Sequence, residues 1–427
     1  MTRESAQSSG SAQPVPLVHW TTWYGLAVLT AINLFAQMDR IALAILLQPI
    51  KAELHLSDQQ LGLLSGLAFA LFYALLGLPL ARIADRASRT RLLSICLTLW
   101  TITTSLTGYS RTFSQLFVTR VGVGIGEAGC LPAAYSLIAD TFPRARRTLA
   151  TAIFQCGGTI GISVGTFIVG LLGHYLGWRA CLQLIGLAGL PIALLIYFTV
   201  PEPARPNPGA STGEPVRQVL TVLWNRPAIV HFTIAYSLAG ISAMGIGQWH
   251  PTFLMRSFGL SMAQVGAWQG LATAVGSILG MLAGGMAATW LSRRDTRWEL
   301  WIPAIATLFT FPCAILLALS PTAWMAITCK VVMAVGSSVA AGVAIAALQA
   351  FVESHRRATA ISIVIFLHSL IGLSLGPYIV GLVSDLVMPT FGKESLRYGI
   401  LSAAVFLPWA AYHYFRASRW SVQNTVS

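Results

Sequence analysis

Long apolar runs alternate with short polar segments along nearly the whole chain. Twelve of these runs are long enough to cross a bilayer as a helix, which takes about 20 apolar residues. They cover residues 21–47, 59–83, 92–109, 113–138, 148–172, 178–199, 228–254, 262–291, 299–319, 322–350, 358–386 and 396–415. The pattern predicts an all-α integral membrane protein with twelve transmembrane helices.

A proline-rich segment divides the twelve predicted helices into two sets of six. The segment PEPARPNPGASTGEP, residues 201–215, follows the sixth run and cannot be helical. The amphipathic stretch VRQVLTVLW comes next, and we expect it to lie on the membrane surface. The expected organisation is a tail, a six-helix half, a linker, a second six-helix half and a tail, at residues 1–20, 21–199, 200–227, 228–415 and 416–427.

Internal repeats relate the two halves. The pattern L-S-x-x-Q-x-G at residues 56–62 recurs 204 positions later, at residues 260–266. The segment GISVGTFIVG, residues 161–170, recurs 211 positions later as GLSLGPYIVG, residues 372–381. Parallel repeats of six helices imply a pseudo-two-fold axis along the membrane normal and a cavity between the halves. This organisation is typical of transporters, and we expect a monomer.

The positive charges predict how the chain is oriented in the membrane. Only 10% of the residues are charged, and the net charge of +13 comes from short clusters between the apolar runs. Such clusters set membrane topology and do not form a nucleic-acid surface. With the N-terminus inside, inner segments hold 18 of the 27 Lys and Arg residues and outer loops hold six. We therefore expect both termini in the cytoplasm of a bacterial inner membrane.

Four charged residues lie inside the apolar runs and form the candidate site. Asp39 and Arg40 are in the first run, and Arg120 and Glu127 are in the fourth, within RVGVGIGEAG. Charges at membrane depth cost several kcal/mol and usually face a polar cavity, so they indicate function. A structural ion pair between two helices is the alternative. The alternate glycines before Glu127 allow a neighbouring helix to pack closely.

Depth along the helices suggests how these four residues are arranged. At about 1.5 Å per residue, Asp39 lies roughly 6–8 Å and Arg120 roughly 9 Å toward the outside, with Glu127 near the midplane. We therefore expect an Asp39–Arg120 contact, with Glu127 farther from a cation and facing the cavity. Glu127 is then the better proton carrier and Asp39 the held partner, while Arg40 or Arg120 reaches toward Glu127 in some states. The four charges cancel, so protonating either acid leaves a net positive site that suits an anionic headgroup.

The loop between the second and third runs carries a family resemblance. ARIADRASRTR resembles the major facilitator superfamily signature G-x-x-x-D-R-x-x-R, with Asp85, Arg86 and Arg89 in place and Ala81 where the family prefers glycine. In the repeat copy, GMAATWLSRR, Thr289 replaces the acid. The resemblance implies the twelve-helix major facilitator fold and a cytoplasmic gate, in which these charges clamp the halves together and release them during alternating access.

Within that superfamily the chain resembles the Spinster group. The carrying residues are MDR at 38–40, GIGEA at 124–128 with Arg120 before it, and IAD at 138–140. The resemblance implies a proton-coupled carrier of lipid-like or other amphiphilic molecules. Other major facilitator groups that carry small organic anions also use an Asp-Arg pair in the first helix, so such a carrier is the alternative.

Two residues of the second half are weaker candidates. The repeat offset places Ala243 opposite Asp39, so the charged machinery is one-sided. Lys330 either answers Arg120 across the repeat, with a one-residue gap, or extends its ammonium to the membrane surface. His368 fits either a hydrogen-bonded packing histidine, which we favour, or a second proton site.

Other functional classes find little support in the sequence. An enzyme would need a nucleophile–base or metal constellation such as H-E-x-x-H, and we expect neither catalysis, a metal nor a cofactor. The chain contains no Walker-type glycine loop, so we expect no ATP-driven pumping. A non-transporting sensor built on a carrier scaffold stays open. The expected ligands are protons and an amphiphilic or anionic small molecule, within a lipid bilayer and without nucleic acid.

Overall fold

The first half of the chain folds into a helical bundle. The computed structural model describes residues 20–203, 216–352 and 357–420, and within these ranges every regular element is a helix. The helices of this half are α1 (Trp20–Leu54), α2 (Asp58–Ser65), α3 (Leu67–Arg86), α4 (Arg89–Thr107), α5 (Phe113–Ala128), α6 (Cys130–Thr141) and α7 (Arg144–Thr199). Pairs α2–α3 and α5–α6 are each one broken span, interrupted at Gly66 and Gly129.

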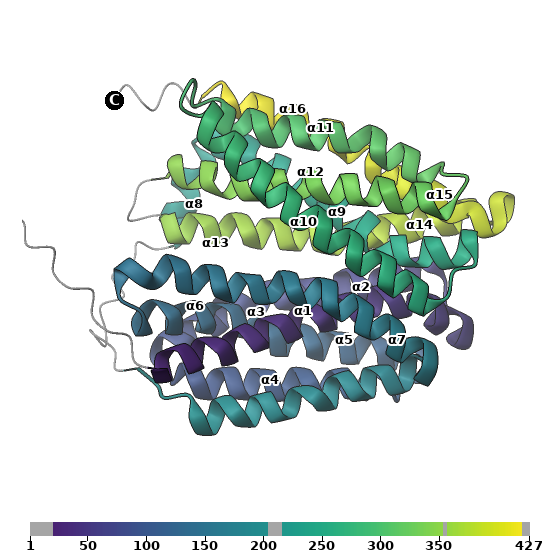
Figure 1. The fold of residues 1–427 in the computed structure, drawn as a ribbon, viewed down its shortest axis with the longest axis horizontal. Coiled ribbons are helices and arrows are strands. Elements are labelled where there is room, and N and C mark those ends of the chain that lie inside the picture. The colour runs from purple at the N-terminus through teal and green to yellow at the C-terminus, as the bar shows by residue number, and fades with distance from the viewer. Residues whose placement is uncertain (1–19, 204–215, 353–356, 421–427) are drawn as a thin grey trace, which may run out of the picture.

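The second half forms a matching bundle beside the first (Figure 1). Its helices are α9 (Pro227–Phe258), α10 (Met262–Leu291), α11 (Trp298–Ala318), α12 (Ala323–Ala350), α13 (Arg357–His368), α14 (Ser374–Phe391), α15 (Ser395–Ala404) and α16 (Phe406–Ser418). A π-helical turn, Ser369–Leu373, joins α13 to α14, and a 3₁₀ turn, Gly392–Glu394, leads into α15. The order of elements agrees with two six-helix halves.

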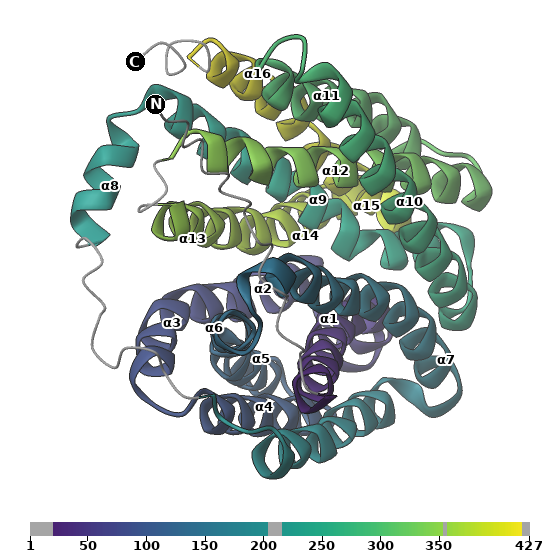
Figure 2. The same ribbon diagram turned by 60° about the vertical axis from the view of Figure 1, so that its left-hand side comes forward.

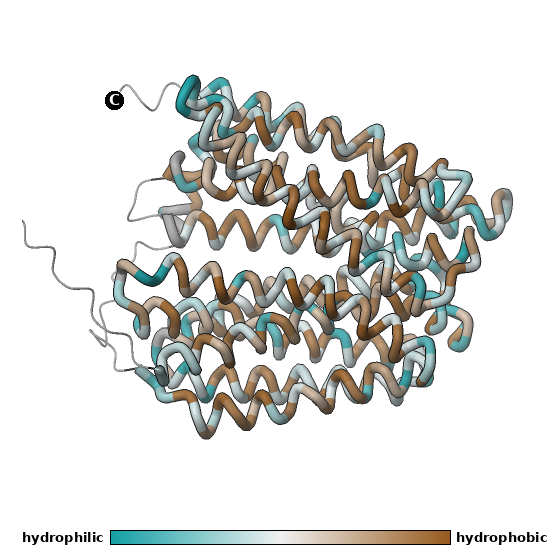
Figure 3. The backbone as a smooth tube through the Cα atoms, in the orientation of Figure 1, coloured by the Kyte–Doolittle hydropathy of each residue, from teal (hydrophilic) through white to brown (hydrophobic). Residues whose placement is uncertain are grey.

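The helices account for twelve membrane spans. Among the described residues, nine helical stretches are long and apolar enough to cross a membrane. Two of them each contain two spans. Helix α7 turns at Gly177, where φ is +79°, a conformation that glycine adopts without strain, and the stretch Thr359–Ser418 turns near Gly392. The threonine-rich α4 crosses beside α5 and α7 as the remaining span. Hydrophobic residues follow the lengths of the helices, and polar residues gather at their ends (Figure 3).

Helix α8 (Val216–Trp224) is the amphipathic helix that the sequence predicts. It contacts α13 and α9 and lies at the outside of the second half (Figure 2). Leu223 is buried, whereas Leu220 and Trp224 are exposed. Its position on a membrane surface stays a prediction, and most of the proline-rich segment before it, residues 204–215, lies outside the described residues.

The two sequence repeats form two equivalent seams between the halves. We call the end of the bundle that contains Trp20 and Ser418 the tail end, and the opposite end the far end. At the far end, a Cβ on Gly62 of α2 would collide with the Pro377 carbonyl of α14. In the repeat copy, a Cβ on Gly266 of α10 would lie 2.8 Å from the Cα atom of Gly170 on α7. Each seam thus brings one repeat motif against the other at backbone contact.

Charged residues reinforce the closure of the far end. The buried Asp58 carboxylate accepts hydrogen bonds from Lys51 Nζ at 2.5 Å, Arg256 Nη1 at 2.7 Å and Ser384 Oγ at 2.6 Å. Arg256 and Ser384 belong to the second half. Asp385 adds a contact across the same boundary by accepting from the backbone N–H of Asp58 at 3.0 Å. We call this group of residues the far-end latch.

Candidate functional site

Close glycine contacts fix the position of α5, the helix that carries two of the four charges. A Cβ on Gly124 would lie 2.6 Å from the Phe69 carbonyl oxygen of α3. A Cβ on Gly126 would lie 2.6 Å from the Trp100 backbone nitrogen of α4. The expected close packing around these alternate glycines is confirmed. Because α5 is held between two helices, Glu127 in its last turn has a fixed direction.

Helix α1, which carries the other two charges, is positioned by a second row of glycines. The row lies on α7 and meets Thr30, Leu34 and Met38 of α1, through Gly157, Gly161 and Gly165. These contacts run up to the residue before Asp39. The four-residue glycine spacing is therefore a packing ridge, as the sequence indicated.

Arg40 and Glu127 form a short ion pair. Arg40 Nε donates to Glu127 Oε1 at 2.6 Å, and the Glu127 side chain is 2% exposed. The guanidinium also lies over two aromatic rings of α3, 4.8 Å from the Tyr73 centroid and 5.1 Å from the Phe69 centroid. Glu127 Oε2 has no hydrogen-bond partner among the described residues. Of the two Glu127 carboxylate oxygens, one thus accepts a hydrogen bond from Arg40, and the other accepts none from the described residues.

Asp39 and Arg120 form a looser pair. Arg120 Nη1 lies 3.8 Å from Asp39 Oδ2, and both side chains are buried. Thr104 and Trp100 lie beside the Asp39 carboxylate. Within the described residues, however, neither Asp39 oxygen accepts a hydrogen bond and Arg120 Nε donates none. The expected Asp39–Arg120 contact is confirmed, but as an ion pair without a hydrogen bond.

One expectation about this network is wrong, whereas the expected reach of Arg40 toward Glu127 is confirmed. Glu127 does not lie away from a cation, because Arg40 holds it more closely than Arg120 holds Asp39. Neighbouring residues point about 100° apart around a helix, so Asp39 and Arg40 face different partners. Helix depth gives the level of each Cα atom, but the long Arg40 side chain bridges the remaining distance to Glu127. Of the two acids, Asp39 is the one held less tightly.

The Arg40–Glu127 pair lies in the wall of a small pocket in the first half. The other lining residues come from α1, α6 and α7 and are mostly apolar: Ile32, Asn33, Ala36, Gln37, Cys130, Leu131, Ala134 and Phe154. Asn33 is tied back by donating to the Phe154 carbonyl at 2.8 Å. The cavity thus offers an apolar surface next to one buried ion pair.

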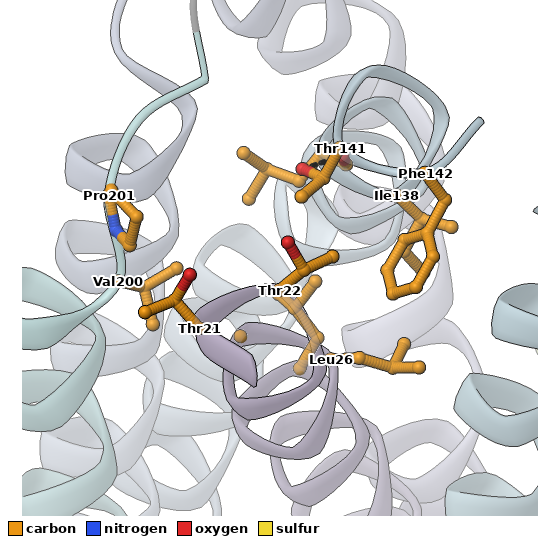
Figure 4. Close-up of a pocket in the computed structure, with 11 residues that line it drawn as sticks. Thr21, Thr22, Leu26, Ile138, Thr141, Phe142, Val200 and Pro201 are labelled. Atoms are coloured by element: carbon orange, nitrogen blue, oxygen red, sulfur yellow. Dashed lines mark hydrogen bonds between the residues drawn. The ribbon is translucent and has the colours of Figure 1, made fainter. Parts of the chain in front are cut away.

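A second pocket lies at the tail end of the first half. The start of α1, the end of α6 and the residues after α7 surround it (Figure 4). Thr21, Thr22 and Thr141 supply hydroxyl groups, and the rest of the lining is apolar. None of the described residues that line it has a titratable side chain. Proton-linked chemistry therefore has its candidate groups in the cavity that contains Arg40 and Glu127.

At the tail end, the signature residue Arg89 contacts the first half and the segment that directly follows it. Arg89 binds the carboxylate of Asp140 on α6 and donates from Nε to Glu202 Oε1 at 2.8 Å. Arg86 is exposed, and the Asp85 side chain lies outside what the structure describes. The expected clamp between the halves is thus not made by Arg89 here. The reason is that both of its acidic partners belong to the first half or to the segment directly after it.

Glu202 anchors the segment that leaves the first half. Burial raises the pKa of its carboxyl group, but hydrogen bonds from the Thr90 backbone N–H and the Arg89 guanidinium outweigh burial and leave the pKa below its ordinary value. Glu202 therefore stays ionised and keeps Arg89 within its own half. Its role was not foreseen, because Glu202 lies in the proline-rich segment and only folding brings it to α4.

The two weaker candidates of the second half differ in their surroundings. His368 Nδ1 lies 3.0 Å from the Tyr236 carbonyl oxygen, and its ring centroid is 4.2 Å from that of Tyr236. These contacts favour the packing role. Lys330 lies near Gly247 and His250 of α9. It belongs to the second half, whereas Arg120 belongs to the first.

Two features of the network were missed in the sequence. Phe69 lies beside both guanidinium groups, 5.1 Å from Arg40 Cζ and 5.7 Å from Arg120 Cζ. Its four-residue spacing from Tyr73 within an apolar run was the available signal, since both residues face one side of a helix. The far-end latch was missed as well, because Asp58 and Arg256 stand at span ends, where charged residues are common.

Known proteins resemble this chain over most of its length. The Major Facilitator Superfamily model matches residues 29–377. An MFS-type efflux pump of Mycolicibacterium smegmatis is 33% identical over 408 residues, which is 93% of each chain. A sphingosine-1-phosphate transporter of Xenopus tropicalis is 25% identical over 413 residues, covering 91% of this chain and 79% of its own.

A solved structure is also similar. The crystal structure of a bacterial homologue of the human lysosomal transporter Spinster, in an inward-facing and unoccupied conformation, matches with a TM-score of 0.86. The two sequences are 29% identical, and the match covers 95% of this chain and 98% of the other. The chain therefore belongs to the major facilitator superfamily of membrane transporters, within which it resembles the Spinster proteins.

Proposed function

We propose that this protein is a proton-coupled secondary transporter that moves an amphiphilic, lipid-like organic molecule by alternating access. The observation that carries the proposal is the Arg40–Glu127 ion pair in the wall of an otherwise apolar cavity. A cavity of this kind suits a molecule with an apolar body and a polar end. A relative that is named for sphingosine 1-phosphate, itself an amphiphile, supports the same substrate class.

The proposed orientation places both termini in the cytoplasm of a bacterial cell membrane. The far end then faces outward, and its closure by the two seams and the latch leaves access from the cytoplasm. The similarity to an inward-facing bacterial relative supports this assignment. We take the transporting unit to be one chain, because the cavity and all four charges belong to a single six-helix half.

Proton coupling would act through the Arg40–Glu127 pair. When Glu127 is ionised, it neutralises Arg40 and holds it by a hydrogen bond. A proton on Glu127 removes that negative charge and leaves Arg40 as a free cation at the cavity wall. The site can then bind an anionic headgroup, so protonation and substrate binding favour the same state. Glu127 is proposed as the proton carrier because it lines the cavity, whereas Asp39 is not among the lining residues.

A carrier of a small organic anion is the second candidate. It is favoured by two guanidinium groups near one ring, with Arg40 Cζ 5.1 Å and Arg120 Cζ 5.7 Å from the Phe69 centroid. The two readings differ in whether an apolar chain is required. Uptake of lysophosphatidate into proteoliposomes, without uptake of glycerol 3-phosphate, would support the amphiphile. The reverse result would support the small anion.

The test of coupling compares two transport assays on the Glu127→Gln variant. The glutamine mimics a permanently protonated acid, so substrate should still exchange in counterflow. Accumulation driven by a pH gradient should be lost, because no protonation change remains to bias the two states. Glu299→Gln, the same change at the start of α11, is the matched control and should keep both activities. Undiminished gradient-driven uptake by Glu127→Gln would move the proton site to Asp39.

A further inference from the structure

A groove lies at the surface of the second half, between the tail ends of α11 and α16. Six residues line it: Arg297, Trp301, Ile305, Phe415, Ser418 and Arg419. Arg297, Trp301 and Ile305 follow one another at four-residue spacing and therefore share one face of α11. Both helices lie on the side of the second half that faces away from the first (Figure 1, Figure 2). The groove is thus separate from the cavity that contains Arg40 and Glu127.

Two arginines at the charged end of the groove have no acidic partner. Among the described residues, neither Arg297 nor Arg419 forms an ion pair, and the buried Arg297 Nε atom has no hydrogen-bond partner. Asp295 Oδ1 accepts from the backbone N–H of Arg297 at 2.8 Å and forms no ion pair with its guanidinium. Glu299 is two residues from both Arg297 and Trp301, so it lies on another face of α11. The described lining of the groove therefore carries two positive charges and no negative charge.

The lining of the groove changes from charged to apolar along α11. Eight residues separate Arg297 from Ile305, so the two side chains begin about 12 Å apart along the helix axis. Trp301 lies between them, and its indole N–H donates to Ser418 Oγ at 2.9 Å. Ile305 and Phe309, one turn farther along the helix, are both exposed. Tryptophan between a charged and an apolar surface is typical of the membrane–water interface, so the apolar part of the groove faces lipid.

We propose that this groove binds one anionic phospholipid of the surrounding bilayer. The lipid phosphate accepts charge-assisted hydrogen bonds from Arg297 and Arg419, since guanidinium groups match phosphate oxygens in geometry as well as in charge. One acyl chain lies over Phe415 and Ile305. An anionic headgroup is favoured over a zwitterionic one, because a zwitterion brings a further cation beside two arginines. A basic groove between membrane helices is the kind of site that anionic headgroups occupy. The ligand is a lipid of the bilayer and not the transported molecule, because the groove lies outside the space between the halves.

The test compares the binding of two lipids with the same acyl chains, phosphatidylglycerol and phosphatidylcholine, to the full-length protein by native mass spectrometry. The wild type should bind phosphatidylglycerol more tightly. The double variant Arg297→Gln, Arg419→Gln should bind phosphatidylglycerol roughly tenfold or more weakly, with phosphatidylcholine binding unchanged. Lysine at both positions keeps the charges and should restore part of the affinity. The matched control is Arg82→Gln, Arg91→Gln, at two exposed arginines of the first half's tail end, and it should bind both lipids like the wild type.

A photoreactive phosphatidylglycerol locates the bound lipid in the same variants. It should cross-link to peptides that contain Ile305 or Phe415, and the double glutamine variant should lose these cross-links. The glutamine variant should unfold at the wild-type temperature, because neither arginine leaves an orphaned acid behind.

Three results would overturn the lipid site. The double glutamine variant could keep the wild-type affinity for phosphatidylglycerol. The control at Arg82 and Arg91 could lose as much affinity, in which case the attraction is a general property of the basic tail end. Inorganic phosphate could displace the lipid completely, which would assign the two arginines to a free anion.

Discussion

The two buried ion pairs differ in how firmly each acid is held. Glu127 accepts a 2.6 Å hydrogen bond from Arg40, whereas Asp39 faces Arg120 at 3.8 Å without one. A carboxylate that lacks hydrogen bonds is stabilised mainly by the charge opposite it. The consequence of neutralising each acid should therefore differ, even though both lie in one network.

Replacing Asp39 by Asn should destabilise the protein as well as impair transport. The change leaves Arg120 buried without its carboxylate, and breaking a buried pair on one side costs roughly 3 kcal/mol or more. Thermal unfolding of the purified protein should shift to lower temperature for Asp39→Asn than for Glu127→Gln. Adding Arg120→Gln to Asp39→Asn removes the orphaned charge and should recover part of the stability. An unchanged melting temperature in Asp39→Asn would contradict the pairing.

For single residues, the sequence predicted the depth of a charged side chain in the membrane better than its ion-pair partner. Asp39 and Arg120 could be paired by counting residues along two antiparallel helices, since helix rise is constant. The Arg40–Glu127 pair depends on how a long side chain bends across about one helix turn, which helix depth does not determine. The contacts of Glu202 could not be predicted for another reason, because its partners Arg89 and Thr90 are more than a hundred residues away in sequence.

The helices of the first half are arranged through glycine contacts at a few crossings. Helix α5 meets α3 at Gly124 and α4 at Gly126, and α1 meets α7 along a separate row. These crossings bring the two charged helices close enough for side chains to pair. The glycine spacing in the sequence was enough to predict close crossings, but not which helix lies against which glycine.

Replacing Gly124 by Ala should destabilise the crossing of α5 and α3. The added Cβ would lie 2.6 Å from a backbone oxygen at Phe69, and a backbone atom cannot move aside as a flexible side chain can. Overpacking of this kind costs about 1–3 kcal/mol. Gly77→Ala is the matched control, because a Cβ there meets no atom within 4 Å and alanine favours the helix by up to about 1 kcal/mol. Thermal unfolding should separate the two variants in opposite directions.

Helix positions followed from the sequence more closely than helix continuity. The twelve apolar runs coincide with the observed spans because length and hydropathy together define a membrane crossing. The breaks at Gly66, Gly129 and the π-helical turn after His368 were not predicted. Such helix breaks depend on packing against neighbouring helices, so the hydrophobicity of a run does not predict them.

The two halves meet mainly at the far end in this conformation. The far-end latch joins Asp58 to Arg256 and Ser384, and the two glycine seams lie beside it. At the tail end, the acidic partners of Arg89 belong to the first half or to the segment directly after it. With the far end outside, as proposed, this distribution of contacts would match the inward-facing state of the similar crystal structure.

Neutralising Asp58 should open the far end. Asp58→Asn removes the charge that Lys51 and Arg256 share, so the closed state loses stability relative to a state open at this end. Spin labels on cysteines placed at His55 and Lys393 should report a new population at longer distance. Asp295→Asn, near the tail end, serves as the control and should leave the distances unchanged. An unaltered distance distribution in Asp58→Asn would reject the latch.

The proposed orientation makes a direct prediction for labelling. In an otherwise cysteine-free variant, cysteines at Ser211 and Thr425 should react with a membrane-impermeant reagent only when the cytoplasmic side is exposed. Both positions lie outside the described residues, so the assay tests the charge-based topology alone. Labelling of Ser211→Cys in intact cells would contradict a cytoplasmic linker.

The glycine seams have a consequence for which substitutions the protein can tolerate. A side chain at Gly62 or Gly266 would strike the backbone of the opposite half. In the proposed transport cycle, that half is a neighbour only while the far end is closed. Each half could still fold with a larger residue there, and a state open at the far end would have room for it. The penalty would thus fall on one stage of the transport cycle and spare the folding of each bundle. The glycines in these repeats are therefore needed for the far end to close, whereas the folding of each half does not require them.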